Sequence, residues 1–169
     1  GGFEILASSL GVTNTSGSDS SFEIDVLLPL TLTPGTAFYG GSMGGSLTGG
    51  DGGGLLTSID GSPLWSASVD GMVIATLGDA PFSYTTDPFG STDIMEESFG
   101  VPIPGFEYAA AQESMSIDMD FLLGGGDTFA ITSTYVSQVP APGVMALLGI
   151  AGLARRRRRG EGRRGNLEF

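Results

Sequence analysis

The side chains that could do chemistry in this chain are nearly all carboxylates. Asp118 and Asp120 stand two positions apart in a segment of alternating polar and apolar residues, so they project from the same face of a strand. A pair of this kind can act as acid and base, or can supply two ligands to Ca²⁺. The same spacing is typical of the solvent face of a half-buried strand, and we favour that interpretation.

Other positions offer weaker chemistry. Asp51 lies among glycines, but the Asp-x-Asp-x-Asp-Gly pattern of a Ca²⁺-binding loop is absent. Glu96 and Glu97 could face another acid, as glycoside hydrolysis requires, although we interpret them as part of an exposed loop. Trp65 is the one Trp in the chain and could stack on a sugar, but a lone Trp more often belongs to a core.

The composition removes most other catalytic chemistry. The chain contains no Cys, no His and no Lys. This excludes a thiol nucleophile, the commonest general base and metal ligand, and the amine that forms Schiff bases. We therefore expect a protein that is not an enzyme and that holds no cofactor or metal.

The most distinctive pattern lies near the C-terminal end, in residues 139–159. Two prolines interrupt the strand that precedes them, because each fixes φ and removes a backbone donor. An uncharged apolar run follows over residues 143–154. The short motif before the run consists of Val139, Pro140, Ala141 and Pro142, and the basic cluster after it consists of Arg155, Arg156, Arg157, Arg158 and Arg159.

The apolar run is short for a membrane span. Its 12 residues would form a helix of about 18 Å, whereas the hydrocarbon core of a bilayer is about 30 Å thick. Arginine side chains can extend that reach by keeping their stems in lipid and their charged ends at the phosphates. We expect insertion with the arginines on the cytoplasmic side. The alternatives are a buried helix with a solvated basic end, and a basic patch for nucleic acid.

Charge is divided sharply along the chain. All seven basic side chains lie between residues 155 and 164, and 17 of the 19 acidic side chains precede residue 155. A body with so much negative charge repels nucleic acid, so we expect no nucleic-acid partner.

The motif, the apolar run and the arginine cluster together resemble a PEP-CTERM sorting signal. The family's motif maps onto Pro140, Ala141 and Pro142, with Ala141 where the family usually has Glu, and its basic stop maps onto residues 155–159. The resemblance implies export by a Gram-negative bacterium that makes exopolysaccharide, and recognition by an exosortase, a membrane-embedded cysteine transpeptidase-like enzyme. Ten residues follow the arginines here, where the family usually ends within a few. The resemblance covers about 20 of the 169 residues.

Sorting of this kind implies export and a transient stay in the inner membrane. Gly1 is not an initiator Met and no basic segment follows it, so we expect that a leader has been removed or that the chain is a fragment. The expected partners are an exosortase-like membrane enzyme, the inner membrane and extracellular polysaccharide. The expected destination is the outer surface or the extracellular matrix.

The remainder of the chain is typical of a strand-rich domain. Residues 65–70 and 72–77 flank Asp70-Gly71, a two-residue hairpin signal. Residues 115–121 and 129–135 alternate in polarity on either side of a Gly-Gly-Gly-Asp turn, which predicts an antiparallel hairpin with one buried face.

We expect two irregular segments between these strands. Residues 40–54 hold nine glycines, which predicts a flexible loop or linker. Residues 87–112 hold three prolines and are expected to be irregular, with one helical turn at residues 108–113. Residues 22–33 alternate in polarity and predict a strand that ends near Pro34.

These patterns predict an all-β fold. We expect a single antiparallel β-sandwich or jelly roll in residues 1–138, followed by a C-terminal hydrophobic helix and basic tail. The sorting signal then occupies residues 139–159, and residues 160–169 form a disordered tail.

The function expected from the sequence is that of an exported, non-catalytic surface or matrix-associated β-domain. Two alternatives remain at this point. One is a surface module that binds carbohydrate or Ca²⁺. The other is an exported hydrolase that works with carboxylates alone.

Overall fold

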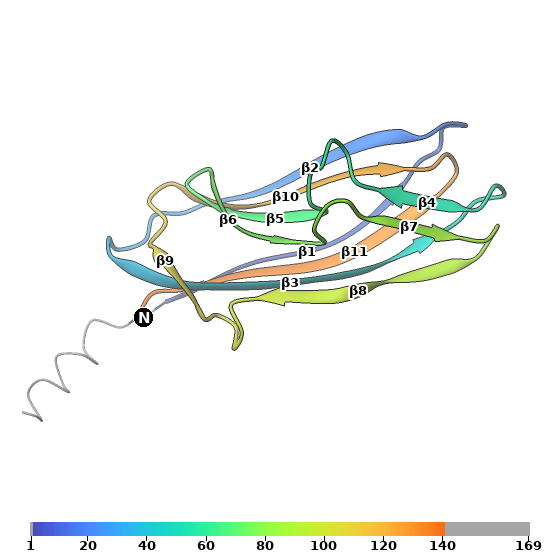
Figure 1. Ribbon diagram of the computed structural model, residues 1–169. Coiled ribbons are helices and arrows are strands. Elements are labelled where there is room, and N and C mark those ends of the chain that lie inside the picture. The colour runs from blue at the N-terminus through green and yellow to red at the C-terminus, as the bar shows by residue number, and fades with distance from the viewer. Residues whose placement is uncertain (1, 141–169) are drawn as a thin grey trace, which may run out of the picture.

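The computed structural model describes residues 2–140. Gly1 and residues 141–169 lie outside the described part, and with them the expected hydrophobic helix and basic tail. The described chain is all-β, and its eleven strands form two antiparallel sheets that pack face to face in a sandwich-like arrangement, as predicted (Figure 1). The strands are β1 (Phe3–Thr13), β2 (Ser20–Pro29), β3 (Thr36–Thr48), β4 (Gly54–Thr57), β5 (Trp65–Val69), β6 (Met72–Leu77), β7 (Ser83–Thr86), β8 (Ser91–Phe99), β9 (Phe106–Ala109), β10 (Ser114–Leu123) and β11 (Thr128–Gln138).

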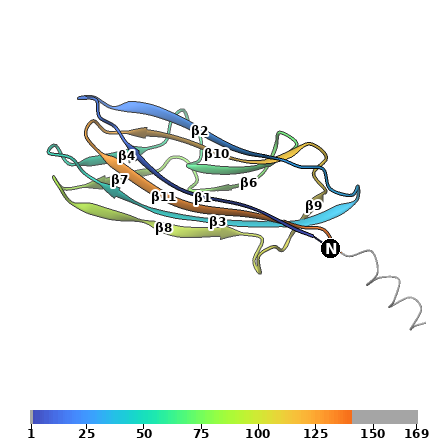
Figure 2. The ribbon, with the colours of Figure 1, turned by 180° about the vertical axis from the view of Figure 1, so that it is seen from behind.

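The first sheet, sheet A, has the strand order β1-β11-β3-β8, with β9 paired to the first residues of β3. Strands β1 and β11 pair over their whole lengths, from Phe3 opposite Gln138 to Thr13 opposite Thr128. Strand β3 lies on the other side of β11 and pairs with it from end to end. Figure 2 shows β1, β11 and β3 running the length of the molecule.

The second sheet, sheet B, is built around β10. Strand β2 pairs along one side of β10, while β5 and β4 pair with different parts of its other side. Strands β6 and β7 extend the sheet beyond β5 and β4. The edge strands β1 and β2 therefore follow one another in the chain but belong to different sheets.

The core lies between the two sheets. Alternate residues of β10 point inward and are 0% exposed, as the alternation in the sequence predicts. The ring of Phe121 on β10 meets the edge of the Phe129 ring on β11, with centroids 4.9 Å apart. Each large side chain removed from water in this way contributes about 1.5–3 kcal/mol. The largest fully buried side chains are Trp65, Tyr39, Tyr135, Phe121 and Phe129.

The two-residue hairpin between β5 and β6 is confirmed. Val69 pairs with Met72, so Asp70 and Gly71 form the whole loop. Both residues have positive φ, 50° and 75°. A type I′ turn requires this backbone, and Asp-Gly adopts it at low cost.

The prediction of a loop over residues 40–54 is wrong for most of the segment, since among these residues only 49–53 lie between strands. Residues 40–48 belong to β3, which lies between β11 and β8. A Cβ at Gly41 would lie 2.7 Å from Thr134 O and 3.2 Å from the Trp65 ring. Glycine is therefore needed here because the opposite strand and an aromatic ring approach the backbone closely.

The predicted hairpin of residues 115–135 is also wrong in its pairing, although both strands exist. Strand β10 pairs within sheet B, whereas β11 pairs within sheet A. The turn at residues 124–127 therefore crosses from one sheet to the other. Alternation identified the buried face of each strand, but it does not identify the neighbouring strand.

Residues 87–112 are more regular than the prolines suggested. They contain β8 and β9, and the expected helical turn at residues 108–113 is absent because Phe106–Ala109 pairs with β3 instead. Strand β1 was not predicted at all. Its exposed and half-buried residues alternate, but Phe3 and Ile5 stand at exposed positions and Glu4 at a half-buried one, so the sequence does not alternate in polarity.

Candidate functional site

The chain leaves the described fold at Val139 and Pro140, directly after β11 ends at Gln138. The Val139 amide donates a hydrogen bond to the Gly2 carbonyl over 3.2 Å. The Val139 side chain also packs against the edge of the core. The first residue of the predicted sorting motif is therefore part of the folded domain, and no spacer separates the two.

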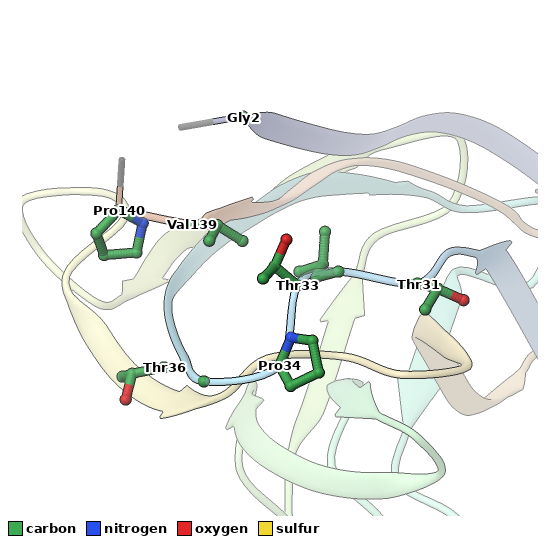
Figure 3. A pocket seen from close by; sticks show the side chains of 9 residues that line it. Gly2, Thr31, Thr33, Pro34, Thr36, Val139 and Pro140 are labelled. Atoms are coloured by element: carbon green, nitrogen blue, oxygen red, sulfur yellow. The ribbon is translucent and has the colours of Figure 1, made fainter. Parts of the chain in front are cut away.

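A groove of about 550 Å³ lies beside these residues. It is formed by the loop of residues 31–36, Gly2, Val139 and Pro140 (Figure 3). None of these side chains carries a charge. The Thr31 hydroxyl donates to Gln112 O over 3.0 Å, so it is committed to the fold. The groove offers apolar contacts and a few hydroxyls, and it contains no acid, base or strong nucleophile.

The other predicted sorting residues are not described. Ala141 and Pro142 lie outside residues 2–140, as do the arginines of the predicted membrane stop, residues 155–159. Their assignment rests on the sequence.

Asp118 and Asp120 lie on the outer face of sheet B, as the half-buried strand predicts. Each faces another acid across the ladder, since Asp118 is opposite Asp25 and Asp120 is opposite Glu23. The Asp118 carboxylate accepts hydrogen bonds from Ser116 Oγ at 3.3 Å and Ser68 Oγ at 3.4 Å. Partial burial raises the pKa of Asp118, and the negative charge of Asp25 raises it further.

The remaining acidic candidates do not converge on one site. Asp51 is exposed in the turn that follows β3. Glu96 is exposed on β8, a strand and not the expected loop. Glu97 points toward the edge of the sandwich, where its Oε2 accepts a hydrogen bond from the Gly78 amide at 2.9 Å. Among residues 2–140 no group of three or more His, Cys, Asp or Glu side chains is arranged to hold a metal ion.

Trp65 belongs to the core and is not available to a sugar. Its side chain is 0% exposed and lies against the rings of Phe99 and Tyr135. Tyr135 in turn donates its hydroxyl to Ser68 O over 3.3 Å, and burial raises the pKa of that phenol. These aromatic rings fill the space between the sheets.

A buried polar cluster that was not predicted lies at the end of the sandwich opposite the groove. Asp127 is 1% exposed, and its two carboxylate oxygens each accept a backbone hydrogen bond of 2.8 Å, from Gly50 and Leu55. Asn14 is 3% exposed and donates to Leu123 O and Ser18 O, both at 2.9 Å. The three glycines before Asp127 are the only local signal, and they indicate a turn without indicating a buried carboxylate.

The described residues include no helix long and apolar enough to cross a membrane.

Comparisons with known proteins add little to this geometry. No family model matches the chain, and no curated protein matches it. Among solved structures, the chain has a distant likeness to one from "Structure of infectious bursal disease virus Gx strain", with 14% identity and a TM-score of 0.29. The likeness covers 81% of this chain but only 37% of the viral chain. So weak a likeness carries no argument about function.

Proposed function

We propose that this protein is an exported, non-catalytic β-domain that an exosortase-like enzyme sorts to the cell surface or the exopolysaccharide matrix. The observation that carries the proposal is the position of the motif. The last strand of the domain ends at Gln138, and the proline motif begins one residue later. This position next to the end of the last strand supports the proposal, because an enzyme could reach the motif without unfolding the domain.

In this proposal the apolar run forms a short helix in the inner membrane. Residues 155–159 remain on the cytoplasmic side, because arginines resist translocation, and the acidic domain lies outside. Proline favours an extended backbone at its own position and at the one before it, and this is the backbone form that proteases and transpeptidases bind. The uncharged groove beside Val139 and Pro140 provides a surface for the enzyme next to the motif.

The membrane segment is better suited to a temporary signal than to a permanent anchor. Six of its residues are strongly apolar, and together they supply roughly −2 to −4 kcal/mol toward insertion. Gly149 and Gly152 weaken a helix by about 1 kcal/mol each relative to Ala. Such a segment can hold the chain at the membrane while an enzyme acts on it.

Mass spectrometry of the surface-exposed protein tests the proposal. The chain should be expressed with an export leader in a Gram-negative host that has an exosortase. We expect C-terminal peptides that end near Pro140–Pro142. Recovery of peptides containing residues 147–153 as the dominant form would contradict sorting and leave a simple membrane anchor.

Two variants make this experiment sharper. Replacing Pro140 and Pro142 with Ala should leave the chain uncleaved at the membrane, because the motif is lost while the apolar run is intact. Replacing residues 155–159 with Ser should weaken retention, because the basic stop is lost. If both variants are processed like the wild type, the tail is not a sorting signal.

A further inference from the structure

A group of apolar side chains lies on the outer face of sheet A, at the end where the chain leaves the fold. We call it the tail-end patch, and its members are Phe3, Ile5, Phe38, Val136 and Ile103. Two rows of the sheet define it. In one row Ile5 is opposite Val136, which is opposite Gly40, and in the next Phe3 is opposite Gln138, which is opposite Phe38.

Three of the five members of the patch are open to solvent, whereas Phe38 is half-buried and Val136 is 9% exposed. Phe3 is 60% exposed, Ile5 61% and Ile103 43%. Ile103 belongs to the loop between β8 and β9, and this loop lies on the sheet: a Cβ built at Gly40 would be 3.0 Å from Ile103 Cγ2. Four separate parts of the chain, β1, β3, β11 and the β8–β9 loop, thus contribute to one apolar surface. Large exposed apolar side chains that gather on one surface mark a contact with another molecule or with lipid.

The segment that follows β11 indicates that the patch contacts lipid. Pro140 follows Gln138, a member of the second row, by two residues, and only Ala141 and Pro142 separate Pro140 from the uncharged run of residues 143–154. The three steps from Pro140 to Gly143 span at most about 11 Å. When the run enters a bilayer, the patch is therefore held close to the headgroups.

We propose that the tail-end patch contacts the lipid surface while the tail occupies the membrane. Phe and Ile side chains would enter the boundary between headgroups and acyl chains, as apolar residues of interfacial segments do. The domain has 17 carboxylates and no basic side chain before residue 155, so the partner is a zwitterionic bilayer surface. Glu107, which is opposite Phe38 on the same face, would remain at the headgroups.

Quenching by brominated lipid tests the contact. The full chain is reconstituted in phosphatidylcholine vesicles with brominated acyl chains, in two variants that each carry one added Trp, Ile5→Trp and Phe89→Trp. Phe89 is 78% exposed but lies next to β8 at the opposite end of sheet A. The native Trp65 is fully buried and gives the same background in both. We expect clear quenching at position 5 and none above background at position 89. Equal quenching of the two variants would overturn the proposal.

A second measurement uses serine substitutions at the same two ends of the sheet. Phe3→Ser with Ile5→Ser should lower the partition of the full chain onto vesicles by about tenfold, because two apolar side chains lose their contact with lipid. Phe89→Ser is the matched control and should leave partition unchanged. Circular dichroism of each variant establishes that the fold is retained, and equal partition of the folded variants would contradict the contact.

A second copy of the chain is the competing occupant of the patch. If copies associate through it, protection of the Ile5→Trp reporter from aqueous quencher will rise with the number of chains per vesicle. Contact with lipid gives protection independent of that number, so a rising value would overturn the proposal.

The proposal rests on the membrane step of the proposed function and not on cleavage. A chain that is quenched at position 5 but never processed would contradict sorting alone. A chain that is processed normally but not quenched would contradict the lipid contact alone.

Discussion

The two ends of the sandwich are closed in different ways. At the end where β10 turns into β11, the buried Asp127 carboxylate binds two backbone amides, and the turn is further tied to the β1–β2 loop by hydrogen bonds between the backbones of Asn14 and residues 126–127. At the end where the chain leaves the fold, Val139 is held to Gly2 by one backbone hydrogen bond of 3.2 Å, beside an uncharged groove. We call these the closed end and the tail end.

The difference between the two ends indicates which end holds the loops in one arrangement and which end can contact other molecules. A buried carboxylate costs stability unless it is hydrogen-bonded, and once bonded it allows only one arrangement of the loops around it. At the tail end the carboxylate that binds backbone amides, Asp70 with Gln112, Glu113 and Ser114, is exposed to solvent. The groove itself has only apolar and hydroxyl side chains, which make no such demand. We infer that the closed end stabilises the domain and that the tail end serves contacts with other molecules.

The largest effect is expected at Asp127. Asp127→Ala removes two hydrogen bonds to a charged group and leaves the Gly50 and Leu55 amides without partners. We expect the free energy of unfolding in urea to fall by about 3–5 kcal/mol. Asp127→Asn keeps the shape and one acceptor oxygen and should lose less. A loss below about 1 kcal/mol for the alanine variant would show that the closed end does not depend on this carboxylate.

A matched pair of glycine substitutions tests whether the closed end is packed more tightly than the tail end. A Cβ at Gly125, at the closed end, would lie 2.7 Å from Ser18 N and 2.8 Å from Gly17 C. Gly125→Ala should therefore lower the unfolding free energy by about 1–3 kcal/mol, because backbone atoms must move. At the tail end a Cβ on Gly2 would meet no atom within 4 Å, so Gly2→Ala should leave stability unchanged. Equal effects in urea denaturation would mean that the two ends are packed alike.

These positions show which parts of the fold the sequence could and could not predict. Alternation along β10 identified its buried residues correctly, because every second side chain is apolar and faces the other sheet. Asp70-Gly71 identified its hairpin because few residue pairs accept positive φ twice. In both cases the signal is local, and a local pattern is sufficient.

Features that depend on distant partners were missed. The glycines of β3 suggested a loop. Position 41 instead requires glycine because Trp65 and the carbonyl of Thr134 lie against its backbone. Asp127 is buried because amides some 70 residues earlier in the chain bind it. Neither reason can be found in the neighbouring sequence. The candidate sorting motif was located from local sequence alone, and the structure adds that Val139 still belongs to the fold.

A smaller effect is expected between the two ends, where the contribution of Asp118 to stability should depend on pH. Partial burial and the facing Asp25 raise the pKa of Asp118 above its ordinary value of 3.8. The folded state thus binds this proton more tightly than the unfolded chain does, so the contribution of Asp118 to stability rises as pH falls through the folded pKa. The gain is complete below the unfolded pKa.

Asp118→Asn tests this contribution. Because Asn carries no charge, the variant should be more stable than the wild type at neutral pH, by less than about 1 kcal/mol since the group is partly exposed. The advantage should disappear at acid pH, where the wild-type carboxyl is also neutral. Asp93→Asn removes an exposed charge from the other sheet and serves as the control in urea denaturation at each pH. An advantage that is constant with pH, or shared by the control, would exclude repulsion between Asp118 and Asp25 as the cause.

The smallest effect on stability is expected from removing the tail. All eleven described strands end by Gln138, and the contacts of Val139 are retained in a chain that ends at Pro140. Such a chain should unfold in urea with the same free energy and the same dependence on urea concentration as the full chain in a mild detergent, within about 0.5 kcal/mol. Ending the chain at Gln138 removes the hydrogen bond to Gly2 and the packing of Val139, and should cost about 1 kcal/mol more. If instead the chain that ends at Pro140 is markedly less stable or aggregates, then the apolar run of residues 143–154 stabilises the domain itself. In that case the apolar run packs on the tail end as part of the core. Neither a sorting signal nor a lipid contact is then needed to explain the exposed apolar side chains there.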